Sequence, residues 1–361
     1  MKHGGDLLSY QHLYEGELLD FSSNINPLGP PKGLKEVFVN AFKDIEVYPD
    51  IQYRKLTRAV ATYLGCKPVE VVVGNGATEI IHNISILFDR VIVPVPSFAE
   101  YMQRPIILGK QVVEVPFGEN LALDVDAVIA NIQPKDLVIV GNPNNPTGKR
   151  IEREKLTKLY AEVVKRDAFL LLDEAFYEFC PQHYDSIRLF EGSEHVGIIR
   201  AATKFFALPG VRLGYAHMSV KNADKYRKIA LPWSVNAFAD AAGSMIFRDA
   251  QYIVDTRTYV AQQREKMLEA LKDIPEIHAF PSDCNYILIK LRYDTQEELF
   301  HAMIKKGIFI RKAASFIGLD NTYIRIAVKD EKSNAYLIKC FKSYFENKLG
   351  VTHEKYHDYR T

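Results

Sequence analysis

Lys204 is the residue of this sequence best suited to covalent chemistry with a carbonyl compound. It follows an apolar stretch and precedes two aromatic residues, Phe205 and Phe206. A lysine shielded from water has a lowered pKa, and its neutral amine can form a Schiff base. Arg212, eight residues further along, supplies a second cation in the same segment. We therefore predict a catalytic amine at Lys204 rather than a solvated surface charge.

A second candidate is Asp173, which ends the apolar run 169–172. An acid at the end of a buried strand also holds magnesium in P-loop ATPases, but that class requires the pattern GxxxxGK[ST]. The chain lacks this pattern, because Gly148 and Lys149 are followed by Arg150. Asp173 is therefore expected to face a buried cation of another kind.

Two further segments could bind a ligand. Residues 73–79 run through Gly74 and Gly76 into the expected start of a helix, where free backbone N–H groups bind phosphate. Residues 141–148 contain two prolines and offer Asn144 and Asn145 as rigid amide donors. An amine, an acid and a phosphate cradle are what pyridoxal phosphate needs, so we predict this cofactor.

These residues must be positioned by the elements that precede them. Short apolar strands alternate with helical patterns, which indicates an α/β fold with a mainly parallel sheet. The expected strands are 71–73, 91–95, 112–115, 137–140, 169–172, 196–199 and 213–217. The helices expected between them include 78–88, 152–166 and 221–230. In such folds ligands bind where strands end, which is where the candidate residues lie.

Beyond about residue 236 the pattern changes to that of a smaller α+β domain. Its expected elements are one long helix over 236–272, strands 286–291, 308–311 and 323–328, and helices 296–306 and 331–348. We predict an N-terminal arm with part of the small domain at 1–45, a large cofactor-binding domain at 46–235, and a C-terminal small domain at 236–361. The polar tail from residue 352 is expected to fray.

Composition excludes several classes of protein. The 361 residues carry 46 Lys and Arg against 45 Asp and Glu, a net charge of +1, which argues against a general nucleic-acid binder. No apolar stretch approaches the length of a membrane span, and no secretory signal is visible. The four cysteines are far apart and are expected to be free thiols in a cytoplasmic protein. We expect no metal site, and expect His353 and His357 to be solvated.

The motifs resemble those of fold-type-I pyridoxal-phosphate enzymes in the class I/II aminotransferase superfamily. The match runs from His3 to about Val328. It rests on Asn-Asn-Pro-Thr-Gly at 144–148, Asp-Glu-Ala at 173–175, and Thr-Lys at 203–204 with an arginine eight residues later. The resemblance implies a large domain with a mainly parallel sheet and a smaller α+β domain.

The resemblance also implies roles around the cofactor ring. Lys204 would form the Schiff base and later move protons, and Asp173 would pair with the pyridinium nitrogen. Asn145 would bond the ring hydroxyl, and Phe98 would stack on the ring. Tyr48 would reach the cofactor phosphate of a neighbouring subunit, which implies a homodimer with shared sites. The remaining predicted cofactor-binding residues, most of them at the phosphate, are Gly76, Ala77, Thr78, Thr203 and Arg212.

Two positions depart from the superfamily pattern. Many relatives have a tyrosine at the position of Phe176, and phenylalanine cannot bond the ring hydroxyl. Relatives often have serine or threonine at the position of Ala201, so one phosphate bond is expected to be lost.

Two reactions compete within the superfamily: transamination, as in histidinol-phosphate aminotransferases, and decarboxylation, as in threonine-phosphate decarboxylases of cobalamin biosynthesis. Four local features resemble the decarboxylases. They are His3-Gly4-Gly5, Ile25 where the aminotransferases usually have glutamate, Phe176, and the segment 231–236. We therefore expect decarboxylation of threonine phosphate, with serine phosphate as a further possible substrate. A cofactor-binding regulator without turnover is a third possibility, which the intact Lys204 disfavours.

The substrate anions need cationic partners. By resemblance, Arg325 binds the α-carboxylate and Arg311 binds the substrate's own phosphate. Guanidinium groups suit both anions because they are planar and permanently charged. Asn24 and His3 are expected at the phosphate end, and Asn145 is expected to contact the substrate as well as the cofactor.

Overall fold

A seven-stranded sheet dominates the computed structural model, which describes residues 4–357 without the side chains of 349–357. Its strands are β2 (Val71–Asn75), β3 (Arg90–Val95), β4 (Gln111–Pro116), β5 (Leu137–Gly141), β6 (Phe169–Asp173), β7 (Val196–Ala201) and β8 (Leu213–Met218). Their order is β2-β8-β7-β6-β5-β3-β4, and only β8 runs antiparallel to its neighbours. Every strand predicted for the large domain is present, and the predicted α/β class is confirmed.

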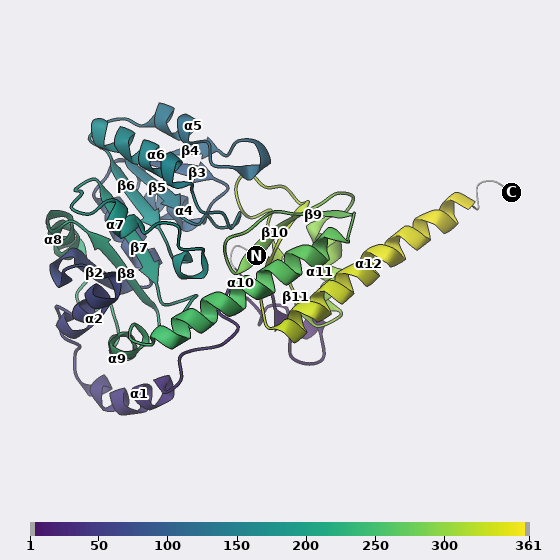
Figure 1. The fold of residues 1–361 in the computed structure, drawn as a ribbon, viewed down its shortest axis with the longest axis horizontal. Helices are drawn as coiled ribbons and strands as arrows, with labels where there is room; N and C mark the ends of the chain where they lie inside the picture. The colour runs from purple at the N-terminus through teal and green to yellow at the C-terminus, as the bar shows by residue number, and fades with distance from the viewer. Residues whose placement is uncertain (1–3, 358–361) are drawn as a thin grey trace.

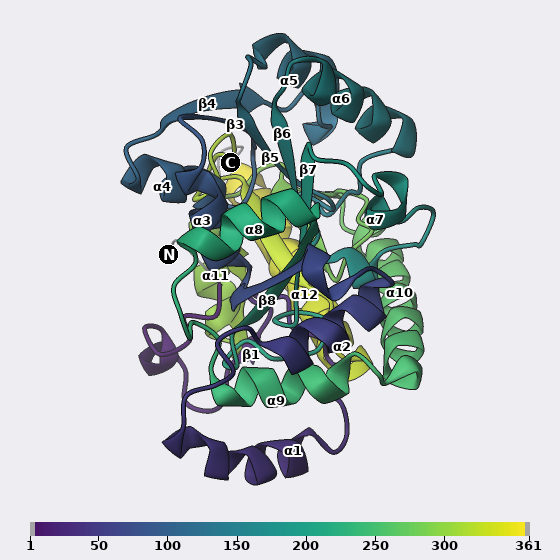
Figure 2. The same ribbon diagram turned by 90° about the vertical axis from the view of Figure 1, so that its left-hand side faces the viewer.

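Helices cover both faces of this sheet (Figures 1 and 2). They include α2 (Arg54–Leu64), α3 (Ala77–Ile86), α4 (Glu100–Ile107), α5 (Val125–Asn131), α6 (Arg153–Lys165), α7 (Ser186–Leu189) and α8 (Val220–Ile229). The alternation of side chains along β6 explains the two cores. Leu170 and Leu172 belong to one hydrophobic cluster with residues of α5 and α6, whereas Phe169 and Leu171 belong to another with residues of α3, α4 and α8. The sheet is therefore buried on both sides, as its apolar runs predict.

The remaining sheets are small. One consists of β9 (Ile277–Ala279), β10 (Tyr286–Leu291), β12 (Arg311–Lys312) and β13 (Tyr323–Ala327), all antiparallel in the order β12-β13-β10-β9. The other pairs β1 (Leu19–Asp20) in parallel with β11 (Ile308–Phe309), so the N-terminal segment joins C-terminal elements. Figure 1 shows these strands with α11 (Gln296–Ile304) and α12 (Glu331–His357) as a second group of elements. The domain boundaries given above stay a prediction.

Three expectations for the C-terminal half are wrong in detail. The long helix expected over 236–272 is two helices, α9 (Ala237–Ile246) and α10 (Ala250–Lys272), because the Asp249 carboxylate accepts from the Tyr252 N–H and caps a new helix. The strand expected over 308–311 is two short strands, since β11 pairs with β1 and β12 pairs with β13. Helix α12 continues to His357, past the predicted end at residue 348 and into the tail that was expected to fray.

The rest of the chain forms short helices and connections. These are α1 (Leu34–Ala41) and the 3₁₀ turns η1 (Gln11–Leu13), η2 (Phe42–Glu46), η3 (Pro68–Glu70), η4 (Glu119–Leu121) and η5 (Tyr177–Phe179). Helix α1 lies at the edge of the molecule beyond α9 in both views (Figures 1 and 2). Within the part of the chain that the structure describes, no helix combines the length and apolarity needed to cross a membrane.

Candidate active site

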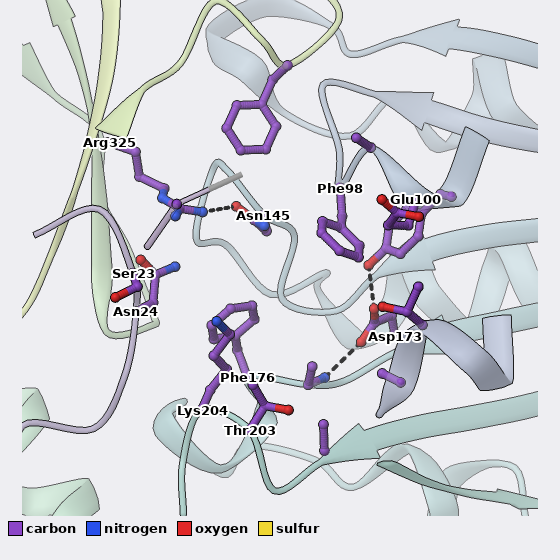
Figure 3. A pocket seen from close by; sticks show the side chains of 18 of the residues that line it. Ser23, Asn24, Phe98, Glu100, Asn145, Asp173, Phe176, Thr203, Lys204 and Arg325 are labelled. Carbon is purple, nitrogen blue, oxygen red and sulfur yellow. Dashed lines mark hydrogen bonds between the residues drawn. The ribbon is translucent and has the colours of Figure 1, made fainter. Parts of the chain in front are cut away.

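A cavity of about 470 Å³ lies between ends of the large sheet and the β12–β13 region (Figure 3). Most of the predicted site residues line it: Asn24, Ala77, Thr78, Phe98, Asn145, Asp173, Thr203, Lys204, Arg212, Arg311 and Arg325. Segments that are far apart in the sequence therefore meet around one space. Gly76 adjoins this lining, Tyr48 does not contribute to it, and His3 lies outside the described residues.

Lys204 lies just beyond the end of β7, and its amine points into the open cavity (Figure 3). The backbone around it is anchored, because Asn26 donates its N–H to the Lys204 carbonyl at 3.0 Å and the Phe205 and Phe206 side chains are fully buried. Burial lowers the pKa of Lys204 to about 8, and the nearby charges of Arg325 and Arg212 add to this effect. A substantial fraction of the amine is therefore neutral near pH 8, as nucleophilic attack on a carbonyl requires.

Asp173 ends β6, and two donors hold its carboxylate in place. The Ala175 N–H donates to Oδ1 at 2.9 Å, and the Tyr101 hydroxyl donates to Oδ2 at 2.8 Å (Figure 3). Burial raises the pKa of Asp173, so the ionised acid is costly unless a cation lies beside it. A protonated pyridine nitrogen is such a cation.

The start of α3 forms the predicted phosphate cradle. Gly76 precedes it with φ of +79°, and a Cβ atom on Gly76 would lie 2.3 Å from Nη2 of Arg212. A Cβ on Gly214 would lie 2.4 Å from the Gly76 carbonyl carbon. Glycine is thus required at both positions for the Arg212 guanidinium and the first N–H groups of the helix to face the same point. This combination suits a phosphate dianion.

Two arginines face the cavity from neighbouring strands of the small sheet. Arg311 on β12 and Arg325 on β13 are directly opposite each other in the ladder. Arg311 donates to the Ser315 hydroxyl at 2.7 Å. Burial lowers the pKa of each guanidinium to about 10, and the charge of Arg325 contributes to the shift at Arg311. Bound anions would relieve this electrostatic cost.

Arg325 is held in an orientation that leaves part of its guanidinium available. It donates through Nη2 to the Ser22 carbonyl at 2.9 Å and through Nη1 to Oδ1 of Asn145 (Figure 3). Its Nε is buried and has no hydrogen-bond partner. Asn24 is also almost fully buried, and its Oδ1 has no partner. Unsatisfied buried polar atoms are costly, so both positions are suited to contacts with a ligand.

Two other predicted residues are Phe176, at the position where many relatives have tyrosine, and Tyr48, which was expected to reach a neighbouring subunit. Phe176 lines the cavity and packs edge-on against Tyr286, with ring centroids 5.0 Å apart. Tyr48 lies on the surface with 79% of its area exposed, and its ring lies 4.6 Å from that of Trp233. Tyr48 therefore takes no part in the cavity of its own chain, and its predicted contact with a neighbouring subunit stays a prediction.

Several lining residues were not identified from the sequence. They are Gly4, Ser22, Ser23, Ala99, Glu100, Tyr101, Arg104, Pro143, Ala175, Ser315 and Phe316. Tyr101 is the most informative, because its position three residues after Phe98 at a helix start places the two rings 5.6 Å apart. That spacing was a usable signal for Tyr101. Ser315 had none, since it lies on a loop whose position depends on the small sheet.

The donor set fits pyridoxal phosphate: a deeply set lysine, a buried carboxylate, and a glycine-lined helix start beside an arginine. Fold and site together define a pyridoxal-phosphate-dependent enzyme. The chain belongs to the class I and II aminotransferase family, whose model matches residues 16–341.

The family's relatives divide between two reactions. A protein of Caldanaerobacter subterraneus subsp. tengcongensis named "Putative threonine-phosphate decarboxylase" is 40% identical, over 98% of this chain and 99% of its own. Histidinol-phosphate aminotransferase 2 of Archaeoglobus fulgidus is 33% identical, over 90% of this chain and 93% of its own.

Solved structures support the same family. The crystal structure of the histidinol-phosphate aminotransferase from Clostridium acetobutylicum superposes with a TM-score of 0.88 at 36% identity. It covers 91% of this chain and all of its own. Similarity of this kind places the chain in the family and leaves the choice between the two reactions to the details of the site.

Proposed function

We propose that this enzyme decarboxylates L-threonine O-3-phosphate to (R)-1-amino-2-propanol O-2-phosphate, a reaction of cobalamin biosynthesis. The observation that carries the proposal is the pair of buried arginines, Arg311 and Arg325, which face one cavity from adjacent strands. A phosphorylated amino acid presents two anions in one small molecule. Histidinol phosphate itself presents only one, because it has no carboxylate, although the 2-oxoglutarate that a transaminase also binds presents two.

The cofactor wall would act as follows. Asp173 would hold the ring nitrogen of pyridoxal phosphate protonated, with Tyr101 and Ala175 fixing its carboxylate. The cofactor, when bound, supplies an electron sink for the bond that breaks at the substrate α-carbon. Phe98 would pack against the ring, and Asn145 would bond its hydroxyl. Gly76, Ala77, Thr78, Thr203 and Arg212 would surround its phosphate.

The substrate wall would select which bond breaks. Only a bond perpendicular to the conjugated ring can release its electrons into it. Arg311, with Asn24, would anchor the substrate phosphate, and Arg325 would hold the carboxylate through its unpartnered Nε. This anchoring would turn the carboxylate, rather than the α-hydrogen, out of the ring plane. Lys204, carrying a proton on its side-chain nitrogen, would donate that proton to the α-carbon once carbon dioxide has left and would become the neutral amine.

Transamination is the alternative, and the Clostridium structure favours it because that protein shares 36% of its aligned residues with this chain. Phe176 weighs on the other side, since the aminotransferases usually carry tyrosine there. Serine phosphate is a lesser alternative as a substrate. It lacks one methyl group of threonine phosphate, and a methyl group supports roughly 10–200-fold discrimination.

A homodimer is part of the proposal. Large apolar side chains are exposed on two segments that the Tyr48–Trp233 ring contact joins. They are Val39, Phe42, Ile45, Val47, Tyr48, Ile51, Leu231 and Trp233. Single chains rarely leave an apolar surface of this kind in water, so a second copy would cover it and bring Tyr48 to its neighbour's cavity. A cytoplasmic location stays a prediction from the sequence.

The test is a comparison of two assays on purified holoenzyme. One contains threonine phosphate without any oxo acid, and the other contains histidinol phosphate with 2-oxoglutarate. The proposal expects carbon dioxide in the first and no glutamate in the second. Glutamate formed from histidinol phosphate, with no carbon dioxide from threonine phosphate, would replace the proposal by the transaminase alternative. Serine phosphate in the first assay measures the contribution of the methyl group.

A further inference from the structure

Three side chains that commonly bind metals meet at the edge of the large sheet, outside the cavity. Cys66, Glu70 and His217 each offer one ligand atom, and these atoms lie within 4.8 Å of one another. They come from the turn after α2, from the end of η3, and from β8. The chain thus brings together a thiol, a carboxylate and an imidazole that the sequence separates by up to 151 positions.

His217 is buried without the partner that a buried histidine needs. It is 7% exposed, and its Nδ1 has no hydrogen-bond partner. An unpaired buried polar atom is destabilising, and contact with a ligand would relieve that cost. Burial also lowers the pKa of His217, so the ring is in the neutral form that metals bind.

The backbone holds the other two ligands close to His217. Gly65, with φ of +67°, ends α2, and Cys66 donates its N–H to the Ala61 carbonyl at 3.0 Å. Glu70 closes η3, and its Oε2 accepts from the Lys67 N–H at 2.8 Å. Val71, the next residue, is the ladder partner of His217. Cys66 and Glu70 are partly exposed, so an ion can enter from solvent.

Arg188 and Arg200 also lie near this cluster, and their positive charges affect the protonation of the Cys66 thiol. A Cβ on Gly65 would lie 2.3 Å from Nη2 of Arg188, and Arg200 is paired with Glu174 and Asp185. Both arginines favour a thiolate at Cys66, but burial and Glu70 outweigh them and raise the pKa of its thiol to about 11. A divalent cation would reverse this balance, because it stabilises the thiolate directly.

We propose that Cys66, Glu70 and His217 bind one zinc-class divalent cation through thiolate, carboxylate and imidazole, with water as the fourth ligand. Mixed nitrogen, sulfur and oxygen ligands in this number suit tetrahedral Zn²⁺. Bonds of about 2.0–2.3 Å place tetrahedral ligand atoms roughly 3.5 Å apart, so the side chains need to move by only about 1 Å. Binding releases the Cys66 thiol proton to solvent.

The site acts on the fold rather than on the reaction. Arg212, which lines the cavity, directly precedes β8. His217 lies four residues beyond the first residue of that strand, and at the usual rise of a strand those two residues are about 13 Å apart. The cation would fasten α2 and η3 to β8, the second strand from the edge of the large sheet. We expect binding to raise the melting temperature of the holoenzyme and to leave its turnover unchanged.

The test uses holoenzyme dialysed against a chelator and titrated with Co²⁺ and then Zn²⁺. One Co²⁺ per chain should give the visible bands of tetrahedral cobalt with a thiolate ligand, and Zn²⁺ should abolish them. Near neutral pH, about one proton per metal should be released. Cys66→Ser, His217→Gln and Glu70→Gln should each weaken binding at least about tenfold, because even loss of an outer partner of a ligand costs roughly that much.

The controls are other candidate ligands of the chain. Cys340→Ser and the double substitution of His353 and His357 by Gln should leave the titration unchanged. Cys180 and Cys284, whose sulfurs lie 3.8 Å apart, are a competing thiol pair. Absence of tetrahedral cobalt bands overturns the proposal. So does binding that survives the three ligand variants, or that is lost in Cys284→Ser instead. Circular dichroism identifies a misfolded variant, and Glu70→Gln, at a partly exposed position, then provides the decisive result.

Discussion

The two walls of the cavity differ in the charges that the chain places on them. On the wall formed by the large sheet, Asp173 accepts from Tyr101 and Ala175, and Lys204 is held in a partly neutral state. On the wall formed by β12 and β13, two arginines lie opposite each other and burial lowers the pKa of both. The first wall holds its single carboxylate with two donors of the chain, whereas the second wall places two like charges side by side.

This difference implies that substitutions on the two walls affect different steps. Changes on the large-sheet wall should alter the cofactor and every reaction that depends on it. Changes on the arginine wall should alter the substrate while the cofactor stays bound.

The largest effect is expected for Lys204→Ala. Without the amine, no Schiff base with the protein forms and no group protonates the α-carbon, so kcat should fall by at least about 10⁴-fold. The visible absorbance of the lysine-bound cofactor should disappear. Lys221→Ala, at an exposed position, is the control and should leave both unchanged. An absorbance band that survives in Lys204→Ala would mean that another amine holds the cofactor.

Arg325→Leu and Arg311→Leu should each lower kcat/KM for threonine phosphate by roughly 10–100-fold, because a hydrogen bond to a charged group contributes about 1.5–3 kcal/mol. The cofactor absorbance should persist in both variants. Arg292→Leu, at an exposed position, is the matched control. Loss of the cofactor from either cavity variant would contradict the separation of the two walls.

The pH dependence of cofactor binding should show that a residue of the arginine wall affects a residue of the large-sheet wall. Only the neutral amine of Lys204 attacks the aldehyde, so the rate at which apoenzyme captures pyridoxal phosphate should rise about tenfold per pH unit below pH 8 and level off above it. The charge of Arg325 lowers the pKa of Lys204. Its removal in Arg325→Leu should therefore raise that pKa and move the profile to higher pH. A profile that stays in place or moves to lower pH would show that Arg325 does not act on Lys204.

The smallest effect is expected for Phe176→Tyr. A hydroxyl at this position would restore a bond to the cofactor ring hydroxyl, and one net hydrogen bond contributes about 0.5–1.5 kcal/mol. Cofactor affinity, measured by fluorescence titration of apoenzyme, should rise roughly 2–10-fold. An unchanged affinity would place the ring hydroxyl out of reach of residue 176. Phe176→Leu serves as the control for altered packing against Tyr286.

The contrast between the walls also explains what could be predicted from the sequence. Lys204, Asp173 and Asn145 lie in short motifs at the ends of strands, so local spacing was enough to group them. Arg325 could be assigned only through resemblance, and its contacts with the Ser22 carbonyl and Asn145 depend on three distant segments.

Helix boundaries and strand partners were harder to predict from the sequence. The capping of α10 by Asp249 and the change of partner between β11 and β12 depend on tertiary contacts that hydrophobic periodicity does not encode. The cluster of Cys66, Glu70 and His217 was missed for the same reason. Cys66 and Glu70 are near each other in the sequence, but only the β2–β8 pairing brings His217 to them.

The most direct test of the proposed reaction is the fate of two labels in one substrate molecule. Threonine phosphate carrying ¹³C at the carboxyl and deuterium at the α-carbon is incubated with holoenzyme and 2-oxoglutarate, and each product is analysed by mass spectrometry. Decarboxylation predicts that ¹³C leaves as carbon dioxide while deuterium remains in the amine product. Retention of ¹³C with loss of deuterium would contradict the account and identify the enzyme as a transaminase.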